Sequence, residues 1–212
     1  MSCTQCMGVK KLFNDKMARR DLKRYLKKGP NKSTKILLEL IRSQNLKDYS
    51  LLDIGGGIGV IQHELYSSGL KTSTDVDASP DYLATAKEES KKRNNEQSSQ
   101  FIEGDFTSDD VKLKSFDIVT LDRVICCYDE MEKLVGKSSS LADKIYAVVY
   151  PRNLLFLKIG SKITSLIMYF FRNPYRMFIH SPEKVDEIIR NNGFFLKNHK
   201  NTLLWRIDLY VK

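Results

Sequence analysis

The sequence has few cysteines and no long uninterrupted apolar run, and each shortage excludes a class of protein. Only four of its 212 residues are cysteines, Cys3, Cys6, Cys126 and Cys127, and its first residues contain no apolar targeting core. A secreted, disulfide-stabilised domain is therefore not expected, and the chain is predicted to be cytoplasmic with reduced thiols. The most apolar stretch, residues 154–171, is interrupted by Lys158 and Lys162. It cannot supply the roughly twenty apolar residues of a membrane-spanning helix.

Metal-ligand patterns are equally scarce. Cys3 and Cys6 have the spacing of a zinc or redox motif, but a structural zinc site normally needs four ligands and no second matching pair follows. The adjacent Cys126 and Cys127 are a poor second pair, because neighbouring side chains point in different directions on a strand or a helix. We therefore expect no metal site.

Positive charge is concentrated at one end of the chain. Up to Ile36 there are eleven Lys or Arg against Asp15 and Asp21, a surplus of nine that equals the formal net charge of the whole chain. Apolar residues recur at near-helical spacing among these cations: Leu12, Phe13, Met17, Leu22, Tyr25 and Leu26. This pattern predicts one amphipathic basic helix, which Gly29 and Pro30 end before a second helix, from Ile36 to Ser43, that Ser33 or Thr34 caps.

A basic helix of this kind is compatible with several partners. It can bind nucleic acid, an anionic membrane surface or an acidic substrate. Its apolar stripe can equally pack on the rest of the protein while its charged face is solvated. The length and the hydrophobic fraction of 42% fit one sizeable core, so a second catalytic domain is not expected.

The segment Leu51–Val60 combines an apolar run with a high density of glycine. It contains Asp53 followed by Gly55, Gly56, Gly57 and Gly59. Continuous hydrophobics predict a buried parallel strand, and glycines directly after it allow a tight turn that approaches a ligand closely. A helix-compatible stretch follows and stops at Gly69. The pattern predicts the first strand, turn and helix of a nucleotide-binding sheet.

The glycine spacing argues against the commonest nucleotides. A dinucleotide fingerprint would need glycine at Val60, and a phosphate-binding loop would need a cation that residues 58–60 do not supply. Asp53, just before the turn, would repel a pyrophosphate but attract an ammonium group.

These residues resemble the first motif of the class I S-adenosylmethionine-dependent methyltransferases, an acid followed by alternate glycines. Asp53, Gly55, Gly57 and Gly59 match it. The resemblance implies that S-adenosylmethionine is the cofactor and S-adenosylhomocysteine the product. It further implies that the glycine turn packs on the methionine moiety and that Asp53 lies near its amino group.

A second motif follows in residues 71–80, which predict a strand leading into a helix capped by Ser79 with Pro80 in its first turn. Asp77 falls at the end of this strand, near the spacing at which an acid meets ribose hydroxyls. Asp75 would share its face of the strand. The resemblance selects Asp77, together with the adjacent Ala78, as cofactor-binding.

A third strand ends in Gly104 and Asp105. A Gly-Asp pair after a strand is also common in ordinary turns. The resemblance implies that Asp105 accepts a hydrogen bond from the adenine amino group and that Phe106 lies close by.

The fourth predicted strand, residues 116–122, leads into the segment from Asp122 to Tyr128. Ligands of open α/β sheets lie beyond the carboxyl ends of strands where the strand order reverses, so this segment is expected beside the transferable methyl group. Asp122 is a candidate for both cofactor binding and proton removal, and the π-face of Tyr128 could stabilise a sulfonium. His180, just before a predicted helix start at Ser181, is a second candidate base or a packed loop histidine.

The predicted fold is α/β: a three-layer α-β-α sandwich with N-terminal basic helices. Its Rossmann-like sheet is expected to have seven mostly parallel strands and, as the resemblance implies, a C-terminal antiparallel hairpin. Residues 1–35 would form a cap, as N-terminal helices often do in the resembling family, and residues 36–212 the cofactor-binding methyltransferase domain. Within the latter, residues 154–180 are a candidate lid or substrate insertion. For residues 154–171, a core-packed helix is favoured over a lid, and a lid over contact with lipid.

The expected activity is methyl transfer to a small, apolar or aromatic molecule. Methylation of RNA or protein, guided by the basic arm, and cofactor binding without catalysis are the alternatives. The segment after the fourth strand lacks the Asn/Asp-Pro-Pro-aromatic loop that the resemblance leads us to expect of an enzyme methylating exocyclic amines of nucleic acids.

Overall fold

A computed structural model describes residues 4–212, with side chains from residue 7 onward. Cys3 and the side chain of Cys6 therefore lie outside its described part. Its central feature is one sheet, in the order β3-β2-β1-β4-β5-β7-β6. The strands are β1 Ser50–Ile54, β2 Thr72–Asp77, β3 Ser99–Glu103, β4 Phe116–Asp122, β5 Ala142–Pro151, β6 Phe195–Asn201 and β7 Trp205–Val211.

The sheet confirms the predicted fold class. Strands β1 to β5 pair in parallel, and β7 lies antiparallel between β5 and β6, which forms the expected C-terminal hairpin. Strand order reverses beside β1, because β2 lies on one side of it and β4 on the other. The carboxyl ends of β1 and β4 therefore flank the crevice where open α/β sheets bind ligands.

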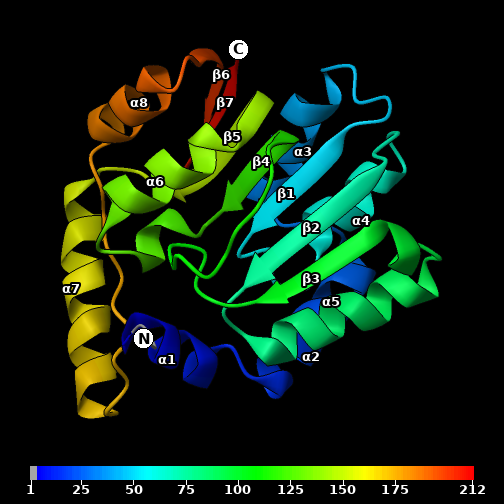
Figure 1. Ribbon diagram of the computed structural model, residues 1–212. Helices are drawn as coiled ribbons and strands as arrows, with labels where there is room; N and C mark the ends of the chain where they lie inside the picture. The colour runs from blue at the N-terminus through cyan, green and yellow to red at the C-terminus, as the bar shows by residue number, and fades with distance from the viewer. Residues whose placement is uncertain (1–3) are drawn as a thin grey trace.

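Helices cover both faces of the sheet (Figure 1). One face packs on α3 Lys32–Arg42 and α4 Val60–Tyr66, and the other on α6 Met131–Ser140 and α8 Pro182–Asn191. Helix α5, Pro80–Lys92, follows β2 and begins as predicted, because the Ser79 hydroxyl accepts the Tyr82 N–H at 3.3 Å. Helix α6 was not predicted from the sequence; three consecutive serines and a glycine weaken its helical pattern.

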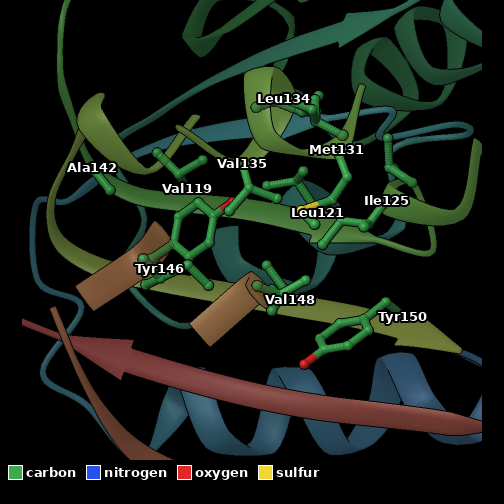
Figure 2. Packing of buried hydrophobic residues seen from close by; sticks show 14 of the residues in the cluster. Val119, Leu121, Ile125, Met131, Leu134, Val135, Ala142, Tyr146, Val148 and Tyr150 are labelled. Atoms are coloured by element: carbon green, nitrogen blue, oxygen red, sulfur yellow. The ribbon is translucent and has the colours of Figure 1, made fainter. Parts of the chain in front are cut away.

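Alternation along the buried strands divides the core into two halves. Successive side chains of a strand point to opposite faces, so Val119 and Leu121 join one cluster while Ile118 joins the other. Figure 2 shows Val119 and Leu121 of β4 with Tyr146 and Val148 of β5, gathered beneath side chains of α6. This double burial holds the strand ends in fixed positions, and with them the site.

The basic N-terminal arm differs from the single helix predicted. It forms α1, Thr4–Leu12, and α2, Asp15–Lys28, because the Asn14 side chain accepts the Met17 N–H at 3.2 Å and starts a new helix. Gly29 ends α2 with a positive φ of 73°, as expected. The next helix begins at Lys32 with Asn31 as its N-cap, so both predicted caps, Ser33 and Thr34, instead lie inside its first turn.

Residues 154–171 are the largest departure from expectation. They form α7, Leu155–Phe170, but the favoured core-packed interpretation is wrong, because Ser161 is the helix's sole fully buried residue. Most of its large apolar side chains face solvent. None of the described helices is both long and apolar enough to cross a membrane.

Candidate functional site

A cavity of about 460 Å³ opens at the carboxyl ends of β1 and β4, where the strand order reverses. Its walls include residues from the N-terminal helices, the start of α3, the glycine turn, the segments that follow β2, β3 and β4, the segment after α7, and the start of β7. Chain segments far apart in sequence therefore close around one space.

The glycine turn forms the floor of this cavity. Gly55 and Gly57 both have a φ of 63°, and both line the space. A Cβ on Gly55 would lie 2.6 Å from a methyl carbon of Val124, so the turn has no room for a side chain there. Gly59 has a different place: it starts α4 with a φ of 77°, faces Gln62 and His63, and does not line the cavity.

Asp53 lines the cavity and has an unsatisfied carboxylate oxygen buried beside Gly56. The residue is 1% exposed; its Oδ1 accepts the Thr120 hydroxyl at 2.6 Å, while Oδ2 has no hydrogen-bond partner. Burial raises the pKa of Asp53 to about 7, with the nearby charges of Asp122 and Asp77 adding to the effect. A cationic group entering the cavity beside Asp53 would favour the ionised form of this carboxyl. The site therefore fits a ligand that carries an ammonium group.

Asp77 lies at the end of β2 and, with Ala78, lines the cavity. Its Oδ2 accepts the Gly57 N–H at 3.0 Å and its Oδ1 accepts the Ser79 N–H at 2.8 Å, so the carboxylate ties the glycine turn to the start of α5. Asp75 does not line the cavity; it accepts the Gly56 N–H from behind the turn at 3.2 Å. The alternation of side chains along the strand does not distinguish Asp75 from Asp77, but in the structure only Asp77 lines the cavity.

The two predicted adenine neighbours lie elsewhere. Phe106 is 1% exposed and packs in the core, with the Lys137 ammonium 5.1 Å from its ring centroid. Asp105 folds back on its own turn, where Oδ1 accepts the Thr107 N–H at 2.9 Å and the Tyr128 hydroxyl at 3.1 Å. Gly104 supplies the cavity wall there instead. The turn after β3 is tighter than predicted, and it directs Phe106 inward.

Asp122 and Tyr128 both line the cavity, as the position of β4 predicts. The carboxylate of Asp122 is held from two sides: Oδ2 accepts the Thr34 hydroxyl at 2.5 Å, and Oδ1 lies 3.1 Å from Arg123 Nε. Arg123 has a positive φ of 66°, an uncommon conformation for a residue with a side chain. Both Asp122 oxygens have donors, which suits the residue to positioning more than to proton removal.

His180 is not placed for catalysis. It does not line the cavity, its Nε2 donates to the Tyr128 carbonyl at 2.8 Å, and its ring stacks on Phe178 at 6.0 Å. Burial lowers its pKa. His180 is therefore better described as a histidine packed in a loop, the alternative to a catalytic base.

The N-terminal helices roof the cavity through three hydrogen bonds to α5 and its cap. The Tyr82 hydroxyl donates to Asp21 at 2.7 Å, the Ser79 hydroxyl donates to the Phe13 carbonyl at 2.6 Å, and the Asp15 N–H donates to Asp81 at 3.0 Å. Phe13 also meets the Tyr82 ring edge-on at 5.6 Å. The roof is thus fixed to the same helix that begins beside Asp77.

Sequence reasoning missed part of the far wall. Tyr175, Met177 and Trp205 line the cavity, although they follow α7 or begin β7. No local pattern marks Tyr175 or Met177, whereas Trp205 could have been singled out as the sole tryptophan. Cys126 and Cys127 also line the cavity as free thiols, the second with its sulfur 3.5 Å from the Tyr175 hydroxyl. Within residues 7–212, no group of three or more potential ligands could hold a metal ion.

Residues 52–141, which contain the glycine turn and all four motif acids, match the family of methyltransferase domains. These residues therefore form a methyltransferase domain, and the sheet around them has the Rossmann-like methyltransferase fold. This is the fold that the resemblance of the sequence motifs implies. No curated protein is significantly similar in sequence to this chain.

Solved structures extend the similarity of the methyltransferase domain to nearly the whole chain. Magnesium protoporphyrin IX methyltransferase from Synechocystis PCC 6803, crystallised with S-adenosylhomocysteine, superposes with a TM-score of 0.74 at 20% identity, covering 98% of this chain and 99% of that one. An O-methyltransferase family protein from Burkholderia thailandensis superposes with a TM-score of 0.66 at 13% identity, covering 84% of this chain and 56% of that one. The [4+2]-cyclase SpnF superposes with a TM-score of 0.64 at 14% identity, covering 84% of this chain and 80% of that one. At these identities the similarity shows the fold alone.

Proposed function

We propose that this methyltransferase transfers a methyl group from S-adenosylmethionine to a small, apolar or aromatic molecule. The single observation that carries the proposal is the roofed cavity of about 460 Å³ over the glycine turn. A space of this size suits a cofactor and a small acceptor. The roof formed by α1 and α2 covers part of the cavity, which favours a small acceptor over a polymer.

In this proposal the chain's acids hold the cofactor. The unpartnered Oδ2 of Asp53 receives the ammonium group of the methionine moiety, and the Asp77 carboxylate accepts the ribose hydroxyls. Gly55 and Gly57 allow the backbone to approach closely, since neither has a side chain. When bound, S-adenosylmethionine supplies a methyl group already activated by a positive sulfonium.

The remaining residues position the reactants and exclude water. Asp122, held by Thr34 and Arg123, fixes the cavity wall beside the end of β4. Tyr128 and Tyr175 supply aromatic surface near the expected position of the sulfonium, where π-faces stabilise a cation. Because the donor carries the activation, orientation and water exclusion supply most of the remaining rate enhancement.

Methyl transfer can be followed with a donor labelled in its methyl group. The purified protein would be incubated with this donor and with separated extract fractions of small molecules, RNA and protein. We expect label in the small-molecule fraction. Label only in RNA or protein would contradict the proposal.

Binding of S-adenosylhomocysteine provides the second measurement. Trp205 lines the cavity and is the sole tryptophan, so its fluorescence should report binding directly. Tight binding with no labelled product in any fraction would contradict catalysis and support the non-catalytic alternative. Absence of binding would contradict the cofactor assignment itself.

A further inference from the structure

Helix α7 presents a continuous apolar stripe to solvent. Seven side chains share one side of the helix, and each is between 46% and 75% exposed: Leu155, Phe156, Ile159, Ile163, Leu166, Ile167 and Phe170. They follow the spacing of one helical face over the whole length of α7. Phe171, directly after the helix, is 78% exposed. Contiguous exposed apolar patches of this kind mark interaction sites.

The opposite side of α7 is the side that packs against the protein, along most of the helix. Ser161 is buried, and its neighbours on that side, Leu157, Thr164 and Met168, are half-buried. An ordinary surface helix turns its bulky apolar residues toward the core and its polar residues toward solvent. Helix α7 does the reverse for most of its length. Figure 1 shows α7 in yellow at the left margin, away from the central sheet.

Charges around the stripe all have one sign. Between Asp143 and Glu183 the chain contains no acidic residue, and its six charged side chains are Lys144, Arg152, Lys158, Lys162, Arg172 and Arg176. Lys158 and Lys162 are exposed and, at four residues apart, lie together along one border of the stripe. An apolar stripe bordered by lysines is typical of a helix that lies in the interface of an anionic membrane.

The basic cap extends this cationic surface. Helix α1 adjoins the segment that follows α7, because the Asn173 side-chain amide donates to the Gly8 carbonyl at 3.4 Å. In the last turn of α1, Lys11 is exposed, whereas Lys10 forms an ion pair with Glu103 at 2.6 Å. Cations near a membrane surface add to its attraction for anionic headgroups.

Other occupants of the stripe fit less well. No residue of α7 lines the cavity, so in this structure the stripe is not a lid over the substrate. Pairing α7 with the same helix of a second copy would bring four lysines together, with no acid on either helix to balance them.

We propose that α7 is an interfacial helix that binds the surface of an anionic lipid bilayer. Its apolar stripe enters the boundary between headgroups and acyl chains, while Lys158 and Lys162 extend to the phosphates. The helix would lie in the plane of the membrane and would not cross it. This proposal does not depend on the reaction proposed for the cavity.

Sedimentation of the full-length protein with lipid vesicles tests the inference. One set of vesicles would be phosphatidylcholine alone, and the other would contain about one-third phosphatidylglycerol. We expect binding to the anionic vesicles that weakens as salt increases, and much weaker binding to the neutral ones. Failure to bind anionic vesicles at low salt would overturn the proposal.

Matched substitutions locate the binding surface. Leu166→Glu should lower the vesicle partition coefficient about tenfold or more, because it replaces an inserted apolar side chain by a charge. The control is Leu203→Glu, which changes an exposed leucine in the turn before β7 and should bind as the wild type does. Circular dichroism would confirm that both variants fold.

Two results would contradict the assignment to α7. Equal vesicle binding by Leu166→Glu and the wild type would place the membrane contact elsewhere. A wild-type dimer in analytical ultracentrifugation that Leu166→Glu dissociates would show that a second copy covers the stripe.

Discussion

Two fully buried acids, Asp53 and Asp75, each have a carboxylate oxygen without a donor, and of the two only Asp53 lines the cavity. The Oδ2 of Asp53 is buried beside Gly56 and has no hydrogen-bond partner, and burial raises the pKa of this carboxyl to about 7. A buried polar atom left unsatisfied is costly, so such an atom at a cavity floor indicates that a ligand completes it. Asp77 is different, because backbone N–H groups already satisfy both its oxygens and fix its position.

Replacement of Asp53 should weaken cofactor binding selectively. In Asp53→Asn the amide cannot balance an ammonium group, and we expect affinity for S-adenosylhomocysteine to fall about tenfold to hundredfold, as for a lost charged hydrogen bond. Isothermal titration calorimetry measures the change. Asp117→Asn is the control, since Asp117 lies near the start of β4, accepts the Ser50 N–H and does not line the cavity, and it should bind nearly normally. Equal losses in the two variants would contradict the role of Asp53.

The raised pKa of Asp53 also predicts a pH dependence of stability. The carboxyl is more easily protonated in the folded chain than in the unfolded chain, so its contribution to stability is fully present at low pH and is lost as the pH rises through about 7. The free energy of unfolding of Asp53→Asn minus that of the ligand-free wild type should therefore be larger at about pH 8 than at about pH 5.5. Denaturant titrations followed by Trp205 fluorescence at the two pH values would measure this difference. A stability difference independent of pH would show that Asp53 titrates normally.

Among the elements, α2 and α7 show opposite uses of amphipathic sequence. Helix α2 buries Ala18 and Tyr25 and directs its cations outward, so the basic arm becomes a roof attached to α5. Helix α7 packs through Ser161 and leaves its apolar stripe exposed. Periodicity shows that a helix has two faces, but neighbouring elements decide which face is buried.

Weakening the contact between α2 and α5 should lower cofactor affinity more than it lowers the stability of the fold. Tyr82→Phe removes the hydroxyl that holds Asp21 and is expected to weaken docking of α2 by about 1 kcal/mol, which would lower cofactor affinity up to about fivefold. Stopped-flow fluorescence of Trp205 should show faster cofactor release. Tyr169→Phe, on the exposed face of α7, is the matched control and should leave the rate unchanged. If Tyr82→Phe released the cofactor no faster, the roof would not retain it.

Across the whole molecule, the C-terminal hairpin is joined to the sheet by a buried charge cluster. Asp208 is fully buried and accepts hydrogen bonds from Arg206 at 2.6 Å and from the Tyr150 hydroxyl at 2.9 Å, while His199 Nδ1 lies 2.6 Å away. The cluster thus connects β5, β6 and β7. Trp205, at the start of β7, reaches the cavity only because this hairpin is held in place.

Removal of Asp208 should destabilise the entire domain. Asp208→Ala leaves the half-buried Arg206 without its partner, and we expect the free energy of unfolding to fall by about 3–5 kcal/mol. Asp15→Ala, which breaks an exposed pair with Arg19, should lower the free energy of unfolding far less and is the control. Urea denaturation measures both. Similar small losses would show that the buried cluster contributes little to stability.

The sequence by itself determined the glycine turn, the start of α5 at Ser79 and Pro80, and the break after α2. Each depends on residues that are close in the chain and on local backbone preferences. The motifs and the resemblance that they carry likewise pointed to Asp53, Asp77 and Asp122, which all line one cavity; their binding roles stay predictions.

Tertiary structure alone decided that Phe106 packs in the core, that His180 binds a backbone carbonyl, and that Tyr175 and Trp205 complete the cavity wall. It also decided that the most apolar helix lies on the surface. Burial depends on which distant segments meet, and no local pattern of hydrophobic residues encodes that information.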